Sequence, residues 1–182
     1  GCLVCGVIPV PVPAPSPLLT ELGLPAYLSI VNDCHPSAQL TSSSYCESKV
    51  FEKLKGFIVN YPQLDNIPFI NTDHLVGKKK TNILIPKKSD IAFLQYTSGS
   101  TSAPKGVCTT FENLDAQTNL YKEHVKTRPC TVTAFWMPHY HDFTLIGGMV
   151  PALYGTTSLV YCSPESFLRR PAIWGDMMTD YK

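Results

Sequence analysis

The sequence predicts an α/β protein in which helices are layered on a largely parallel sheet. Segments typical of buried strands alternate along the chain with segments whose apolar residues have helical spacing. The hydrophobic fraction of 44% and the net charge of +1 are typical of a folded chain. The apolar stretches are far shorter than the roughly 20 residues of a membrane-spanning helix. Without an excess of basic residues, nucleic acid is not an expected partner.

The length and the two ends predict a partial chain. The 182 residues suit one domain or a piece of a larger one. The chain opens at Gly1 inside an apolar run, and Trp174–Lys182 resembles an unfinished helix. We therefore expect residues 1–182 to be an incomplete portion of a longer protein.

The seven cysteines are scattered through apolar segments, and no signal peptide precedes them. This pattern predicts reduced, mostly buried thiols in a cytoplasmic protein. Cys2 and Cys5 match the C-x-x-C spacing of redox and zinc sites. Packing on one helical turn is the simpler interpretation, because no second cysteine pair or nearby histidine completes a site.

The first half of the chain predicts short elements punctuated by proline. Leu24, Tyr27, Leu28 and Val31 have helical spacing, and Pro25 suits the first position of a helix. The expected elements are the end of a buried helix at Gly1–Gly6, an edge strand or extended segment at Val7–Val12, a helix from Pro25 to His35-Pro36, a strand at Gln39–Ser42, a helix at Glu47–Phe57 and a strand at Pro68–Asn71.

The second half begins with a lysine-rich segment, Val76–Asp90, for which a solvated loop is favoured over an anion site. The apolar run Ile91–Tyr96 predicts a strand buried on both faces. Thr109 and Glu112 have the spacing of a capping box. The remaining expected elements are a hairpin partner at Gly106–Thr109, a helix carrying Phe111, Leu114, Tyr121 and Val125 on one side, strands at Val132–Met137 and Ser158–Tyr161, and helices at Leu145–Tyr154 and Pro171–Tyr181.

The segment Tyr96–Gly106 is the strongest local signal for chemistry. It places five Ser and Thr hydroxyls, two glycines and Lys105 between two strand-like segments. Backbone N–H groups and hydroxyls of such a loop can surround an anion, and Lys105 adds a full charge for phosphate oxygens. It is not a Walker loop, because Lys105 precedes Gly106 and a strand rather than opening a helix. Taken alone, a flexible turn is the competing interpretation.

Four blocks in order carry a resemblance to a known family. The stretch L-Q-Y-T-S-G-S-T with P-K-G-V resembles the phosphate-binding signature of the adenylate-forming (AMP-dependent synthetase/ligase) superfamily. The stretch W-M-P-H-Y-H-D-F-T-L-I-G-G resembles a segment of its fatty acyl-AMP ligases. The stretch S-P-E-S-F-L-R-R-P-A-I-W and the opening Gly1–Pro13 are similar to two further blocks of the same ligases. The chain would then be an incomplete slice of the large N-terminal AMP-binding domain.

The resemblance implies ATP-dependent activation of a fatty acid to an acyl-adenylate, with release of pyrophosphate. The acyl group would pass to an acyl carrier protein thiol, often in polyketide biosynthesis; CoA is the alternative acceptor. ATP would be used with Mg²⁺, whose ligands the sequence does not identify. Segments for adenine and ribose and the small C-terminal domain lie downstream in the family, so the fragment alone is expected to be inactive.

The resemblance also implies roles for individual residues. Lys105 and His141 would be catalytic, with His141 near the acyl carbonyl. The β- and γ-phosphates would be held by Thr97, Ser98, Gly99, Ser100, Thr101 and Lys105. Acyl-binding candidates, for which packing in the core is the alternative, are Trp136, Met137, His141, Leu145, Ile146, Gly147 and Met149.

Besides Phe143, which replaces a methionine of the family pattern, three positions depart from it: Ser102 and Thr144 replace glycines, and Phe111 stands where many members have histidine. They motivate a third hypothesis, a non-catalytic homologue that binds acyl chains or acts as a scaffold. The residues His139, His141 and Asp142 also suggest a metal, but nothing in the sequence fixes the geometry of a third ligand.

Overall fold

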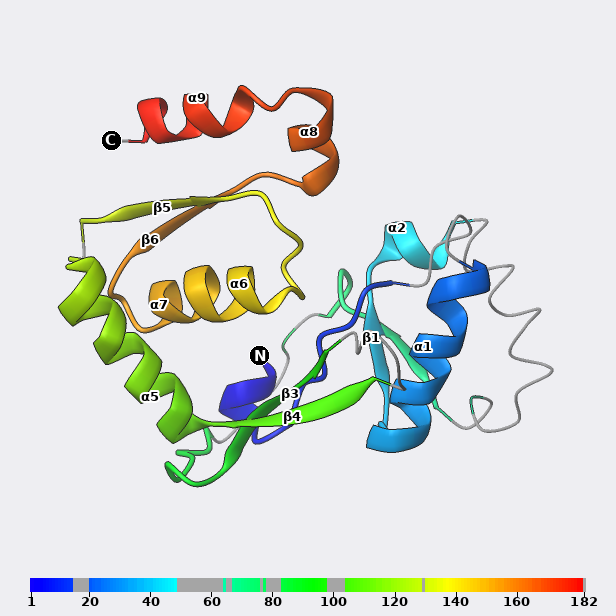
Figure 1. Ribbon diagram of the computed structural model, residues 1–182. Helices are drawn as coiled ribbons and strands as arrows, with labels where there is room; N and C mark the ends of the chain where they lie inside the picture. The colour runs from blue at the N-terminus through cyan, green and yellow to red at the C-terminus, as the bar shows by residue number, and fades with distance from the viewer. Residues whose placement is uncertain are drawn as a thin grey trace. The chain divides into compact units, whose positions relative to one another are not determined.

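The computed structural model describes residues 1–14, 20–48, 64, 67–75, 77, 83–97, 104–128 and 130–181. The chain divides into two compact units (Figure 1). The first comprises Gly1–Leu84 with Leu94–Val107, and the second comprises Ile85–Phe93 with Cys108–Lys182. None of the helices in these described ranges is long and apolar enough to cross a bilayer.

The core of the first unit forms around helix α1, Thr20–Cys34. Leu24, Leu28 and Val31 are buried together, and Phe69 packs against them. Phe69 belongs to strand β2, Phe69–Asn71, which pairs in parallel with β1, Gln39–Thr41. The predicted helix and both predicted strands are thus confirmed, with a short helix α2 between them at Ser43–Cys46.

Two details of α1 differ from the sequence prediction. Pro25 lies inside the helix rather than at its first position. A proline has no N–H, so α1 loses one backbone hydrogen bond here, the one that position 25 would donate to the carbonyl of residue 21 near the start of the helix. The end is as expected: the helix stops at Cys34, and His35 adopts a left-handed backbone with φ of 46°.

The N-terminal stretch contains a single turn of 3₁₀-helix, η1, at Cys2–Cys5, in which no residue is buried. The prediction of a buried helix end is therefore wrong. Residues 7–14 contain no strand, but the Leu94 amide donates to the Pro9 carbonyl at 3.1 Å. Prolines remove the other donors that a ladder would need, so the extended alternative holds.

Strand β3, Ile91–Thr97, pairs with β4, Lys105–Thr110. The connection from Thr97 to Lys105 is too short for the crossover that a parallel pair requires, so this pair is the predicted hairpin. Ala92, Phe93 and Gln95 are buried, as expected for a strand that contributes to the core on both faces. Residues 83–90 before it are exposed, in agreement with a solvated segment.

The second unit has a layered arrangement around a two-stranded parallel sheet (Figure 1). Helix α9 packs on one face, where the Trp174 indole donates to the Ala134 carbonyl at 2.9 Å. On the other face of the sheet, the ring of Phe135 lies against Gly148. Its elements are α5 Phe111–Leu120, η3 Tyr121–Val125, β5 Val132–Phe135, α6 Asp142–Thr144, η4 Leu145–Met149, α7 Val150–Leu153, β6 Ser158–Tyr161, α8 Pro164–Arg169 and α9 Ile173–Asp180.

The predicted capping box is displaced by one residue. Thr110, not Thr109, caps α5 and accepts from the Asn113 amide at 3.2 Å, while Asn113 rather than Glu112 returns the contact. Asparagine is short enough to reach the Thr110 amide, at 3.0 Å. Glu112 still favours the helix start through its negative charge in the first turn.

The α/β class is confirmed, but the single largely parallel sheet is not seen in the described ranges. Those ranges hold three two-stranded sheets, of which β1–β2 and β5–β6 are parallel. The predicted helix Glu47–Phe57 lies almost entirely outside the described residues. The cysteines are free, as expected, but not mostly buried: Cys5, Cys108 and Cys130 are exposed and the other four are half-buried.

Candidate functional site

The predicted phosphate-binding loop is described at its two ends. Thr97 is the last residue of β3 and Lys105 is the first residue of β4, and both side chains are exposed. Ser98, Gly99, Ser100 and Thr101, together with Ser102, lie outside the described residues. The hairpin pairing of β3 with β4 brings the two ends of the loop onto neighbouring strands.

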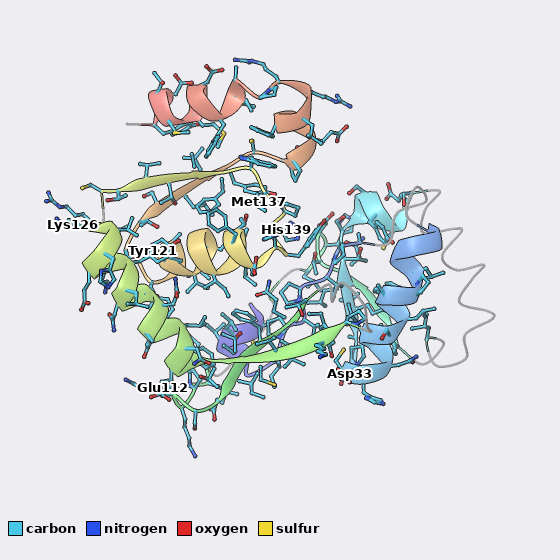
Figure 2. All side chains as sticks on the ribbon, viewed as in Figure 1. Asp33, Glu112, Tyr121, Lys126, Met137 and His139 are labelled. Carbon is cyan, nitrogen blue, oxygen red and sulfur yellow. The ribbon has the colours of Figure 1, made fainter. Side chains whose placement is uncertain are left out.

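A tyrosine next to the loop is fixed by two contacts. The Tyr96 hydroxyl donates to Asp33 Oδ2 at 2.5 Å, and Asp33 is at the carboxyl end of α1 (Figure 2). The same ring lies against Gly106, where an added Cβ would stand 2.9 Å from Tyr96 Cζ. Burial, followed by the hydrogen bond to Asp33, raises the pKa of Tyr96, so its hydroxyl remains a donor at neutral pH.

His141 caps the short helix α6 in the second unit. Its Nδ1 accepts from the Phe143 amide at 3.2 Å and lies 2.6 Å from Asp142 Oδ1. Nδ1 cannot accept from the amide and donate to the carboxylate at once, so the tautomer selects one partner. With Nδ1 accepting, the proton of the neutral ring is on Nε2. The side chain is 46% exposed, so Nε2 can reach a ligand.

Thr144, which replaces a family glycine, is accommodated in this turn. It is fully buried, and its hydroxyl donates to the Met137 carbonyl at 3.1 Å. This hydrogen bond ties the start of the helix to the segment after β5, which Figure 2 marks with Met137 and His139. The substitution therefore adds a contact rather than a clash, and it weakens the argument that Thr144 disables the protein.

The acyl-binding candidates lie on both sides of this turn. Trp136 stacks on Phe167 with ring centroids 3.9 Å apart, which supports the packing alternative for its indole. Gly147 is buried, and an added Cβ there would stand 2.8 Å from the Tyr121 hydroxyl. Met137, Leu145, Ile146 and Met149 are all half-buried.

The structure thus gathers the predicted residues into two groups. Thr97 and Lys105 belong to the first unit, and His141 with the acyl-binding candidates belongs to the second. Sequence analysis missed Asp33, because its partner Tyr96 is 63 positions away and no local pattern links them. A carboxylate at the end of a helix was the one available signal, since that placement is electrostatically unfavourable without a partner.

A metal site is not defined. The described part of the chain contains no cluster of three or more His, Cys, Asp or Glu that could hold an ion. The structure therefore assigns no ligand to the Mg²⁺ that the resemblance implies, and His139, His141 and Asp142 do not form a metal cluster.

Comparison with known proteins gives a family match over the whole chain. The family model described as AMP-binding enzyme matches residues 1–182. The chain is 33% identical over 191 aligned positions to the medium-chain-fatty-acid–[acyl-carrier-protein] ligase JamA of Moorena producens, covering 100% of this chain and 30% of JamA. It is 31% identical to FadD21 of Mycobacterium leprae, named as a fatty-acid–CoA ligase, covering 96% of this chain and 30% of that protein.

A solved structure of a fatty-acid ligase also matches the whole chain. The fatty acyl-adenylate ligase from L. pneumophila, in complex with acyl adenylate and pyrophosphate, superposes with a TM-score of 0.77 at 32% identity. The match covers 100% of this chain and 30% of that one. The chain therefore spans about a third of the length of the relatives that it matches.

Proposed function

Because the chain belongs to the AMP-binding enzyme family, whose fatty-acid ligases it resembles from end to end, we propose that its full-length protein is a fatty acyl-AMP ligase. Residues 1–182 are then a portion of the large N-terminal AMP-binding domain. The protein uses ATP to convert a fatty acid to an acyl-adenylate and pyrophosphate. One observation carries the proposal: exposed Thr97 and Lys105 close a hairpin whose loop sequence resembles the phosphate-binding signature, in a chain that matches the family throughout.

The chemistry requires a negative carboxylate to approach a negative triphosphate. A carboxylate oxygen attacks the α-phosphorus, a new C–O–P linkage forms, and the bond to the β-phosphate breaks, with its electron pair leaving on pyrophosphate. Negative charge grows on the leaving group, so fixed donors and cations there lower the barrier. In the proposal Lys105 supplies the charge, and Thr97, Ser98, Gly99, Ser100 and Thr101 supply hydroxyl and amide donors.

In the proposal, His141 contacts the other reactant, the fatty acid carboxylate. Its Nδ1 is occupied by the Phe143 amide or by Asp142, which fixes the ring and leaves exposed Nε2 to face the carboxylate. With the proton on Nε2, the imidazole donates to one carboxylate oxygen and orients the other toward phosphorus. Trp136, Met137, Ile146, Gly147 and Met149 are proposed to contact the acyl chain.

The acceptor of the acyl group distinguishes two candidate functions. Similarity to JamA favours a carrier-protein thiol, as in polyketide biosynthesis, and similarity to FadD21 favours CoA. We place the carrier protein first, because the motif of residues 136–148 resembles the acyl-AMP ligases. Product analysis with CoA and with a phosphopantetheinylated carrier protein separates them: the first proposal predicts acyl-adenylate that accumulates in the presence of CoA and is consumed by the carrier protein.

The test of the proposal is fatty-acid-dependent exchange of labelled pyrophosphate into ATP by the full-length protein. Exchange that requires both the acid and ATP is the expected result. No exchange with any fatty acid, from medium to long chain, would support the non-catalytic hypothesis instead. The isolated 182 residues are expected to show no exchange.

A further inference from the structure

The two ends of the predicted phosphate loop, Thr97 and Lys105, are connected through a residue outside the loop, Tyr96. Tyr96 is bonded covalently to Thr97 on one side of the hairpin, and its ring rests against Gly106, the neighbour of Lys105, on the other. Tyr96 therefore links the two ends of the predicted phosphate loop: its backbone continues into Thr97, and its ring contacts the residue after Lys105. Its hydroxyl in turn donates to Asp33 on α1. All of these residues belong to the first unit.

We propose that Asp33 is a positioning residue for ATP, acting through Tyr96. Asp33, Tyr96 and Gly106 form a clamp, the tyrosine clamp, that sets the separation of Thr97 from Lys105 and thereby the geometry in which both meet the phosphates. The inference rests on the proposed function, and it assigns to α1 a part in nucleotide binding that no motif of the sequence indicates.

The contacts explain why each member is needed. A phenylalanine at position 96 would keep the ring against Gly106 but lose the hydrogen bond that holds its far end to Asp33 Oδ2. A side chain at position 106 would push the ring away, since its Cβ would stand 2.9 Å from Cζ and 3.0 Å from the hydroxyl oxygen. The Cys34 thiol, also on α1, interacts with the Tyr96 hydroxyl as well, and this second contact helps to hold the tyrosine ring in its orientation.

The clamp is not explained by packing of the core alone. The Asp33 carboxylate is exposed, so its removal leaves no cavity and no buried charge without a partner. A purely structural contact of this kind contributes little to stability. The clamp includes the neighbours of Thr97 and Lys105 and lies outside the core cluster of Leu24, Leu28 and Val31. Its loss should therefore affect ligand binding more than stability.

The test compares Tyr96→Phe, Asp33→Ala, Asp33→Asn and the double variant Tyr96→Phe/Asp33→Ala in the exchange assay of the full-length protein. We expect the KM for ATP to rise about tenfold in the first two variants, with the KM for the fatty acid within about twofold. The double variant should be no worse than either single one, because both remove the same contact. Asp33→Asn retains an oxygen acceptor and should stay within about threefold of wild type.

A matched control is available in the second unit. Tyr154 also hydrogen-bonds to a carboxylate, that of Asp115, but lies at the end of α7 rather than beside the loop. Tyr154→Phe should leave the KM for ATP unchanged. A second measurement does not need activity: amide hydrogen exchange at Thr97 and Lys105 should accelerate in Tyr96→Phe, while exchange at Val160 in β6 should not.

The outcomes are distinguishable. An active protein in which Tyr96→Phe and Asp33→Ala leave the KM for ATP unchanged, or add in the double variant, would overturn the clamp and leave the proposed function standing. Unchanged hydrogen exchange at Thr97 and Lys105 would overturn it too. A wild-type protein without acid-dependent exchange would overturn the proposed function, and with it the role of Asp33 in ATP binding.

Discussion

The two groups of predicted site residues are held in different ways. Beside the phosphate loop, Tyr96 is tethered to Asp33, which is 63 positions away in the sequence. Around His141, the contacts are local: Phe143, Asp142 and the hydrogen bond from Thr144 to the Met137 carbonyl span only a few residues. A change in α1, far away in the sequence, can therefore disturb the loop, whereas the described hydrogen bonds of the histidine turn come from residues close to it in the sequence.

The largest expected effect is on the loop, from Lys105→Ala. If Lys105 carries the charge that faces the leaving pyrophosphate, acid-dependent exchange in the full-length protein should fall about a hundredfold. Lys122→Ala is the matched control, because Lys122 is also exposed and lies in η3, outside both groups. Equal activities of the two variants would contradict the role of Lys105.

The next effect concerns the close approach of Gly106 to Tyr96. Gly106→Ala should raise the KM for ATP about tenfold, as Tyr96→Phe does, because the added Cβ displaces the ring from Asp33. The free energy of unfolding should fall by no more than about 1 kcal/mol, because the displaced contact is exposed. Gly175→Ala in α9 is the control: nothing lies within 4 Å of its added Cβ, so it should stabilise by up to about 1 kcal/mol. Urea unfolding of both variants measures the difference, and a stabilised Gly106→Ala would mean that the ring is free to move.

The histidine turn is tested by Thr144→Val, which removes the buried hydroxyl but keeps the shape. We expect the free energy of unfolding to fall by about 1–2 kcal/mol, with the KM for ATP unchanged. Thr179→Val is the control, since its hydroxyl also donates to a backbone carbonyl, that of Gly175 at 3.0 Å, but is exposed. That change should stay within about 0.5 kcal/mol. A raised KM for ATP in Thr144→Val would show that the two groups are coupled.

The smallest effect is a pH dependence in the second unit. Burial, and then the hydrogen bond to Asp115, raises the pKa of Tyr154 to about 12. A raised pKa means that the folded state holds the proton more tightly, so this contribution is complete below the ordinary pKa of about 10 and is lost as the pH rises toward 12. In Tyr154→Phe, the free energy of unfolding measured with urea should decrease less steeply with pH between about 10 and 12 than in the wild type. An equal decrease in both proteins would show that Tyr154 is not its cause.

The sequence predicted the elements whose signals are local. The apolar run of β3, the spacing of α1 and the strands β5 and β6 were all confirmed, because burial and periodicity are properties of neighbouring residues. The capping box moved by one residue, since Thr109 and Thr110 are both good caps and only geometry selects between them. Short elements with little apolar content, such as α2 and α8, were missed.

The site shows the same limit. The motifs located Lys105 and His141, but they did not indicate how either residue is held. The tether from Tyr96 to Asp33 depends on how α1 meets β3, a tertiary contact between two segments that carry no common pattern. The buried role of Thr144 likewise appears only when its hydroxyl is seen to donate to the Met137 carbonyl.

The central claim is that a fatty acid carboxylate attacks the α-phosphorus of ATP. The most direct measurement follows a heavy-oxygen label from the carboxylate of the fatty acid through one turnover of the full-length protein with its acceptor. The account predicts one labelled oxygen in AMP and none in pyrophosphate, because the attacking oxygen stays on phosphorus when the acyl group leaves. Label in inorganic phosphate, or AMP without label, would contradict it.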